Sequence, residues 1–197
     1  MKKVISIMGS PRKNKNTDML LDTFTNGVLE NGYSVEKINL IEKKISPCVA
    51  CGYCEKTGKC IIKDDMDEIY SLFDEGDIFV IASPLYFNTV SSFTKMVIDR
   101  CQKYFSLKYS LNEVYRKGQN RTGIFISVGG APYSHDHFNS CIGTMDFFFK
   151  SIDAKYLGNY FVSGSDKNPV WDRDDVLKEV YNIGKNIDKL SNFYLHR

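Results

Sequence analysis

Short apolar runs alternate with longer amphipathic segments along this chain, and this alternation constrains the fold more than any other feature of the sequence. We expect strands at residues 4–8, 34–40, 77–82, 122–127 and 155–162. We expect helices between and after them, at residues 17–30, 65–75, 91–104, 136–151 and 172–191. Strands separated by helices predict a parallel sheet with right-handed crossovers, because a parallel pair needs a long connection.

Five such strands predict an α/β three-layer fold with the flavodoxin-like strand order 2-1-3-4-5. The composition fits a single domain over residues 1–197, because 43% of the residues are hydrophobic and can supply one sizeable core. Ligands of this fold bind at the carboxyl edge of the sheet. The segments that follow strands one, three and four should therefore line the site.

A polar turn follows the first expected strand and leads directly into a helix. It reads G-S-P-R-K-N-K-N-T, residues 9–17. Ser10, Asn16 and Thr17 offer hydroxyl and amide donors. Arg12 adds a planar cation, and the helix start adds free backbone N–H groups. The combination predicts a site for a terminal phosphate, whereas a solvated turn in which Thr17 or Asn16 merely caps the helix is the structural alternative.

The turns after the third and fourth expected strands are also informative. The first reads S-P-L-Y-F-N-T-V, residues 83–90, and offers aromatic surface and an amide to a flat heterocycle. Taken alone, Phe87 fits the core better, because burial statistics favour the interior for phenylalanine. The second reads S-V-G-G-A-P, residues 127–132. Its paired glycines would let a ligand approach the backbone, although a plain turn would use them too.

Four of the six cysteines lie within thirteen residues, in C-V-A-C-G-Y-C-E-K-T-G-K-C, residues 48–60. The apolar run at residues 4–8 is too short for a signal peptide or a membrane span, so we expect a cytoplasmic protein. In that compartment, clustered cysteines bind metal or act in catalysis more often than they form disulfides. Cys101 and Cys141 fall in expected helices, and we expect both to be buried.

These motifs together resemble a known family. The turns at residues 9–17 and 83–91, the following K-x-x-I-D-R at residues 95–100, and a cysteine-rich insert at about residues 46–62 are similar to the NAD(P)H-dependent FMN reductase branch of the flavodoxin-like superfamily. Within that branch, the iron–sulfur flavoproteins carry a compact C-x2-C-x2-C-x(4–7)-C motif, which is matched by Cys48, Cys51, Cys54 and Cys60. The resemblance extends to about Asp153, and the remainder carries little motif content.

The resemblance implies that FMN is a cofactor and indicates where it binds. The FMN phosphate would be held by Ser10, Arg12, Asn16 and Thr17. The ribityl chain and the isoalloxazine ring would be bordered by Pro84, Leu85, Tyr86, Phe87 and Asn88. The other side of the ring would be closed by Ser127, Gly129 and Gly130.

The spacing of the four cysteines suits one [4Fe–4S] cluster. Three thiolates at three-residue intervals can gather around a small object, and Cys60 can return as a fourth ligand after the flexible residues 57–59. Zinc sites with four thiolates typically use two C-x2-C pairs with a longer spacer. Zinc remains an alternative, as does a loop without metal, because related reductases can keep this cysteine pattern and bind none.

The function implied by these features is that of an FMN-dependent oxidoreductase, which exchanges electrons between ferredoxin or NAD(P)H and a small acceptor. One alternative is a cluster-free NAD(P)H-dependent FMN or quinone reductase. Another is a non-enzymatic electron carrier like flavodoxin, although such carriers tend to be acidic and the net charge here is +2. The basic residues are spread along the chain, so neither nucleic acid nor a membrane is an expected partner.

No residue is assigned as catalytic from the sequence. His135 and His137 follow the third turn, whereas His196 falls in what we expect to be a frayed tail. Lys95 and Asp99 lie one helical turn apart, so we expect an ion pair between them.

We expect a homodimer, or a tetramer of two dimers, because closed two-fold interfaces dominate among soluble oligomers. An apolar segment after the third helix could form an interface arm or fold back onto its own domain. Its apolar members are Tyr104, Phe105, Leu107, Tyr109, Leu111 and Tyr115.

Overall fold

The computed structural model describes residues 1–113, 116, 120–134 and 136–197. Across the described residues, one parallel sheet has six strands in the order β2-β1-β3-β4-β5-β6. The strands are β1 Lys3–Met8, β2 Ser34–Asn39, β3 Ile78–Pro84, β4 Thr122–Val128, β5 Lys155–Val162 and β6 Phe193–His196. The flavodoxin-like order of the first five strands is as predicted, and β6 extends the sheet beyond β5.

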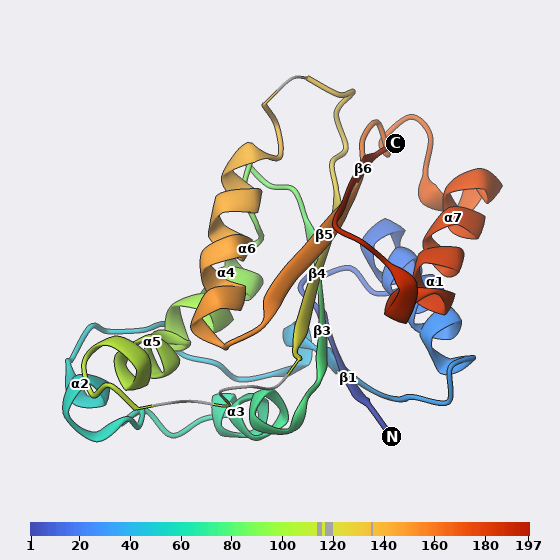
Figure 1. The fold of residues 1–197 in the computed structure, drawn as a ribbon. Helices are drawn as coiled ribbons and strands as arrows, with labels where there is room; N and C mark the ends of the chain where they lie inside the picture. The colour runs from blue at the N-terminus through green and yellow to red at the C-terminus, as the bar shows by residue number, and fades with distance from the viewer. Residues whose placement is uncertain (114–115, 117–119, 135) are drawn as a thin grey trace.

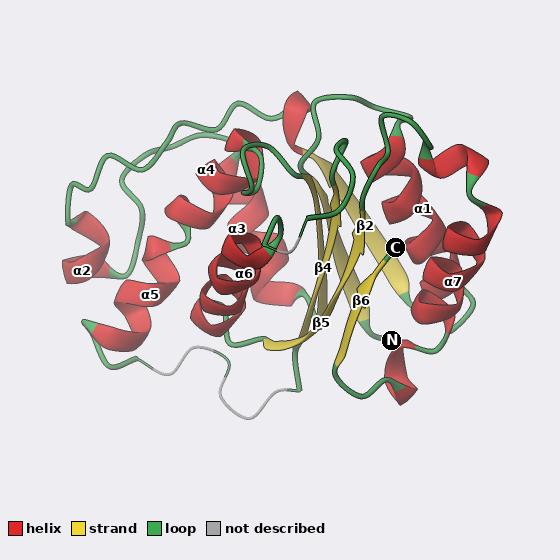
Figure 2. Cartoon of the chain, turned by 90° about the horizontal axis from the view of Figure 1, so that it is seen from above, coloured by secondary structure: helices red, strands yellow, loops and turns green. Residues whose placement is uncertain are grey.

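Helices cover both faces of this sheet (Figure 1). One face carries α1 Asn16–Leu29 and α7 Asp174–Lys185, and the other carries α3 Met66–Glu75, α4 Ser92–Arg100 and α6 Asn139–Ser151. Two shorter helices, α2 Tyr53–Thr57 and α5 Gln102–Tyr109, lie outside this second layer, away from the sheet (Figure 2). Three 3-10 turns complete the described elements: η1 Leu40–Glu42, η2 Val170–Asp172 and η3 Ile187–Lys189.

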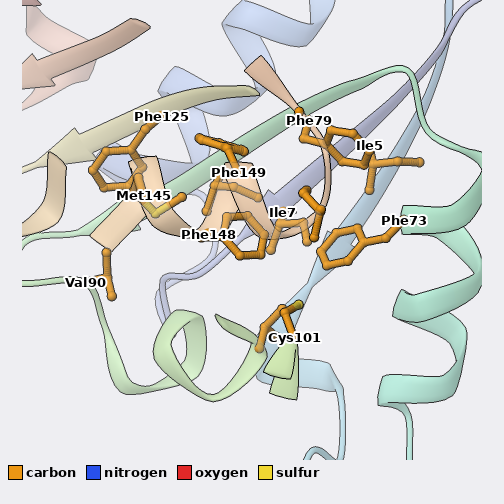
Figure 3. Packing of buried hydrophobic residues seen from close by; sticks show 14 of the residues in the cluster. Ile5, Ile7, Phe73, Phe79, Val90, Cys101, Phe125, Met145, Phe148 and Phe149 are labelled. Atoms are coloured by element: carbon orange, nitrogen blue, oxygen red, sulfur yellow. The ribbon is translucent and has the colours of Figure 1, made fainter. Parts of the chain in front are cut away.

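The apolar runs of the strands bury side chains on both faces, so the sheet has two hydrophobic cores. The core under α3, α4 and α6 is rich in aromatic rings, including Phe73, Phe79, Phe125 and Phe149, which are packed together in Figure 3. Cys101 belongs to this core and Cys141 packs into it as well, so the predicted burial of both cysteines is confirmed. Burial raises the pKa of the Cys141 thiol to about 12, so it stays protonated at neutral pH.

The predicted strand number was wrong because β6 has only four residues. The expected closing helix ends early, with α7 at Lys185, and the chain then returns to pair with β5. His196 therefore lies in a strand, where its Nε2 is 2.8 Å from Ser163 Oγ, and the predicted frayed tail is also wrong. So short a strand carries too little periodicity to be recognised in sequence.

Two expected helices also differ from those observed. The helix expected at residues 91–104 is two helices, because the chain turns at Cys101 between α4 and α5. No glycine or proline marks this break in the sequence. The helix expected at residues 136–151 begins at Asn139.

Candidate functional site

The three turns singled out in the sequence lie together at the carboxyl edge of the sheet, and backbone hydrogen bonds join them. Gly9 N–H, after β1, donates to Ala82 O at 2.7 Å, and Leu85 N–H, after β3, donates to Val128 O at 2.8 Å. Gly129 N–H, after β4, donates to Val162 O at 2.8 Å. The strand order therefore assembles the edge at which ligands bind in this class of fold.

The turn at residues 9–17 presents donors to solvent at the start of α1. The helix has no side-chain cap, so neither Asn16 nor Thr17 serves as the cap that the structural alternative required. Ser10 is buried, and its Oγ accepts the Arg12 N–H at 3.1 Å, which fixes the turn. The Arg12 side chain is exposed. Uncapped backbone N–H groups, beside a guanidinium that has no side-chain partner among the described residues, form a favourable environment for an anion.

The buried carboxylate of Asp18 stabilises the same turn from the protein interior. Asp18 accepts the backbone N–H of Asn14 at 2.7 Å and the Lys37 ammonium at 2.6 Å. Burial, the largest single influence, would lower the pKa of Lys37, but its hydrogen bonds and charge interactions with Asp18 and Asp22 together raise that pKa. Lys37 therefore remains charged and offsets the negative charge of Asp18 beneath the turn.

The C-terminal part of the chain also reaches this turn, which the sequence did not predict. Val170 N–H donates to Asn16 Oδ1 at 2.9 Å, and the Lys15 ammonium lies 5.3 Å from the centre of the Trp171 ring. The Asn16 amide oxygen is thus taken, while its NH2 group can still donate. Residues 154 positions apart in sequence meet here, so local sequence patterns carry no signal for the contact.

The turn after β3 forms a small hairpin whose tip faces solvent. Tyr86 and Thr89 exchange backbone hydrogen bonds of 2.9 and 3.0 Å, and the two residues between them have positive φ angles, 49° at Phe87 and 57° at Asn88. Phe87 is fully exposed, so placing it in the core was wrong. A large residue that is both exposed and left-handed is unusual, and such strain is concentrated at functional sites.

The turn after β4 is shaped largely by contacts inside the protein, which the sequence did not predict. Ser127 is fully buried and donates its hydroxyl to Ser83 O at 2.9 Å, so it supports the edge from inside the sheet. A Cβ at Gly130 would lie 2.5 Å from an Asp166 carboxylate oxygen, so this glycine makes room for Asp166. A Cβ at Gly129 would make only ordinary contacts with Leu85 and Phe138.

The four cysteines of the motif are free thiols that all line one cavity of about 590 Å³. Cys48 and Cys51 are exposed, whereas Cys54 and Cys60 are half-buried. The opposite wall comes from the end of α4, the start of α5 and one face of α6. Ser106, on α5, lies with its Oγ 3.4 Å from Cys54 Sγ. The fold thus brings together the four thiols that the sequence singled out.

The donor set of this cavity fits an iron–sulfur cluster better than a single metal ion. Four thiolates are the usual ligands of a [4Fe–4S] centre. Among the described residues, no three cysteine, histidine or carboxylate side chains lie close enough together to hold one metal ion. A cubane binds its four cysteines through four different irons, so it needs a wider set of sulfur atoms than tetrahedral zinc does. The structure supplies four thiols around one cavity of about 590 Å³, which is the donor type that such a cluster uses.

Helix α5 packs against the cysteine-rich segment, so the apolar segment after α4 folds back, which is the second of the two expected alternatives. Tyr104 is fully buried, and its hydroxyl donates to Tyr70 O at 3.1 Å. Leu107 packs over Gly58, which ends α2 with a φ of 66°. Tyr109 is exposed, and Tyr115 lies outside the described residues.

The remaining polar predictions have mixed outcomes. Lys95 and Asp99 form the expected ion pair at 2.7 Å on the exposed face of α4. His137 is half-buried, and His135 lies outside the described residues. Within the part of the chain that is described, no helix has the length and apolar character to cross a bilayer.

The strand order, the helical layers and the polar carboxyl edge define a flavodoxin-like α/β protein. An FMN-dependent NADH-azoreductase from Bacillus anthracis, solved in complex with FMN, has the same fold. It superposes with a TM-score of 0.70 at 17% identity, over 94% of this chain and 99% of that one.

The sequence comparison is more specific than the fold. The profile of the NADPH-dependent FMN reductase family matches residues 2–167, so the chain belongs to that family. An iron-sulfur flavoprotein of Methanocaldococcus jannaschii is 39% identical over 124 residues, which cover 61% of this chain and 64% of the relative. One of Archaeoglobus fulgidus is 40% identical over 102 residues, which cover 52% and 46%. The matches therefore span from about half to just under two thirds of these relatives.

The resemblance predicted from the motifs is confirmed by this membership. The family is described as one of NADPH-dependent FMN reductases, so membership supports the predicted class of flavin-dependent oxidoreductase and FMN as the cofactor.

Proposed function

We propose that this protein is an FMN-dependent oxidoreductase that passes electrons between ferredoxin or NAD(P)H and a small acceptor, through FMN and one [4Fe–4S] cluster. The observation that carries the proposal is the convergence of all four motif cysteines on one cavity. The names of the relatives add support, because both are called iron-sulfur flavoproteins. In this proposal residues 1–197 act as one FMN-binding domain.

The carboxyl edge would bind FMN through the residues singled out in the sequence. Ser10, Arg12, Asn16 and Thr17 would hold the phosphate at the start of α1. The isoalloxazine ring would lie between the hairpin and the turn after β4, bordered by Pro84, Leu85, Tyr86, Phe87, Asn88, Ser127, Gly129 and Gly130. Ser127 would act indirectly, because its hydroxyl is already bonded inside the sheet.

The cysteine cavity would hold the cluster through Cys48, Cys51, Cys54 and Cys60. Bound FMN accepts or donates electrons in pairs or singly, whereas an iron–sulfur cluster exchanges one at a time. The protein would position the two groups on separate elements, with FMN on turns of the sheet and the cluster on the segment between η1 and α3.

The direct test is anaerobic reconstitution of the purified protein with iron and sulfide in the presence of FMN. We expect about one FMN and one [4Fe–4S] cluster per chain, with broad absorbance beyond the flavin bands. Reduced ferredoxin and NAD(P)H are then compared as donors by the rate at which each bleaches the flavin. Four free thiols and no bound iron after reconstitution would reject the cluster.

A cluster-free NAD(P)H-dependent FMN or quinone reductase is the second candidate. The observation in its favour is the match of residues 2–167 to the NADPH-dependent FMN reductase family, because that description names no cluster. It predicts rapid flavin bleaching by pyridine nucleotide alone and no iron. Steady turnover with any donor and acceptor would distinguish both candidate enzymes, with or without a cluster, from a non-enzymatic electron carrier.

We further propose that the protein is a homodimer or a tetramer of two dimers. Exposed apolar side chains line the cysteine cavity, including those of Val49, Ile61 and Phe147. A second chain could cover them and shield a redox centre from solvent. Light scattering at micromolar concentration should report at least a dimer, and a 22.5 kDa monomer that retains both cofactors and full turnover would contradict this.

A further inference from the structure

Arg100 occupies an unusual position at the last residue of α4. Its side chain is only 1% exposed, yet it lines the cavity of the four thiols. Burying a guanidinium is costly unless its donors are satisfied. The partners of Arg100 therefore indicate what this residue does.

The guanidinium binds both ends of the cysteine-rich segment. Arg100 Nη1 donates to Ser46 O at 2.8 Å, and Nη2 donates to Ile62 O at 3.2 Å. Ser46 lies two residues before Cys48, and Ile62 lies two residues after Cys60. One buried side chain thus closes residues 46–62 into a loop whose ends are fixed on α4.

Asp64 completes this closure. It pairs with Arg100 through both oxygens, at 2.8 and 3.2 Å, and accepts the Ser46 backbone N–H at 2.8 Å. Burial, the largest single influence, would lower the pKa of Arg100, but the hydrogen bond to Asp64 and the charge interactions with neighbouring groups together raise that pKa, so the group stays cationic. The planar guanidinium donates to two carbonyls and a carboxylate at once. A lysine ammonium cannot reproduce this geometry.

One donor of Arg100 remains unused. The Nε atom is buried and has no hydrogen-bond partner among the described residues. A buried donor without a partner is destabilising, and in native proteins it calls for an explanation. Arg100 lines the thiol cavity, so an acceptor bound in that cavity could provide the missing partner.

We propose that Arg100 is a positioning residue that closes the cysteine-rich loop around its cavity and offers its free Nε–H to a sulfur of the group held there. The second half of this proposal rests on the proposed function, because it needs an iron–sulfur cluster. The first half does not, because it concerns the chain alone. Hydrogen bonds to cluster sulfurs and nearby positive charge both raise the reduction potential of a cluster.

The first experiment tests loop closure without iron. Hydrogen exchange is followed in FMN-loaded, iron-free wild type, R100Q, R100K and the control K95Q. Lys95 lines the same cavity from the same helix but pairs only with surface Asp99 in the described structure. We expect residues 46–62 to exchange about tenfold faster or more in R100Q and R100K, and unchanged in K95Q, because charged hydrogen bonds at both loop ends are lost.

If R100Q fails to fold, R100K still tests the closure, because lysine keeps the buried positive charge and lacks only the forked guanidinium. Retention of FMN shows that a variant is folded, since FMN is assigned to other turns. Exchange in residues 46–62 at the wild-type rate in the folded Arg100 variants would overturn the closure.

The second experiment tests the Nε–H contact in reconstituted protein. The cluster potential is measured by a redox titration monitored by electron paramagnetic resonance. We expect a more negative potential in R100K than in wild type, with a smaller change in K95Q. Equal potentials in wild type and R100K would overturn the contact and leave the closure supported by exchange. If the wild type binds no iron, the cluster fails as a proposed cofactor and the contact fails with it, while the exchange result still decides the closure.

Discussion

The carboxyl-edge turns and the cysteine-rich segment are held by different means. The turns leave the strands directly, and backbone bonds such as Gly9 N–H to Ala82 O continue the sheet into them. The cysteine-rich segment leaves the sheet after η1 and is fixed at its ends by side chains, chiefly Arg100 and Asp64. The difference teaches that the sheet itself holds the turns of the first site in place, whereas the position of the cysteine-rich segment depends on side-chain contacts at its two ends.

The largest effect is expected for a substitution that removes iron binding and leaves FMN binding intact. We expect C54S to lose iron binding after reconstitution while it retains FMN, because a serine oxygen is a poor substitute for a thiolate ligand. Iron, sulfide and flavin are assayed per chain. C141A is the matched control, since Cys141 is buried outside the motif and should not alter iron content. Loss of FMN with full iron in C54S would show that the two sites are not separate.

A smaller effect is expected at the phosphate turn. Replacement of Arg12 by alanine should weaken FMN binding by about ten- to hundredfold, because a charge-assisted hydrogen bond of about 1.5–3 kcal/mol is lost. Titration of the apoprotein with FMN measures this change. Lys13→Ala is the control in the same turn, because Lys13 is already paired with Glu42. An R12A affinity equal to that of wild type would remove Arg12 from the site.

The smallest effect is expected at the hairpin tip. F87G should lower FMN affinity by roughly two- to tenfold through loss of aromatic surface. The same change should alter the unfolding free energy of the apoprotein by less than about 1 kcal/mol, because relief of the left-handed strain offsets the greater freedom of glycine when unfolded. Urea denaturation and FMN titration measure the two quantities. F87Y keeps the ring and should bind FMN as wild type does; a loss in F87Y equal to that in F87G would argue against a role for the ring.

These comparisons also show what the sequence could predict. Strands β1, β3, β4 and β5 were predictable because each is a local apolar run, and the turns that follow the strands were predictable from strand order. Strand β2 is polar, with the sequence S-V-E-K-I-N, and was predictable from the turn-forming Asn31-Gly32 before it. The four cysteines could be grouped by spacing, and the structure places them around one cavity. Strand β6 was missed because four residues give too weak a pattern.

The contacts that fix the candidate sites were beyond reach for a different reason. Arg100 meets Ser46 across 54 residues, and Val170 meets Asn16 across 154. Such pairs follow from the packing of distant elements, so no local pattern records them. For Phe87, burial statistics taken alone favoured the core, whereas the family resemblance placed it at the flavin site. The statistics failed because they describe average tendencies and not strained turns.

The position of Trp171 gives the protein a built-in optical probe. It is the only tryptophan in the chain, and it lies partly exposed over Lys15, beside the turn that begins α1. Oxidised flavin absorbs light at the wavelengths at which indole emits, so a flavin bound at this edge would quench the emission by energy transfer. Occupancy of the edge can therefore be followed by fluorescence in the unlabelled protein, without interference from a second indole.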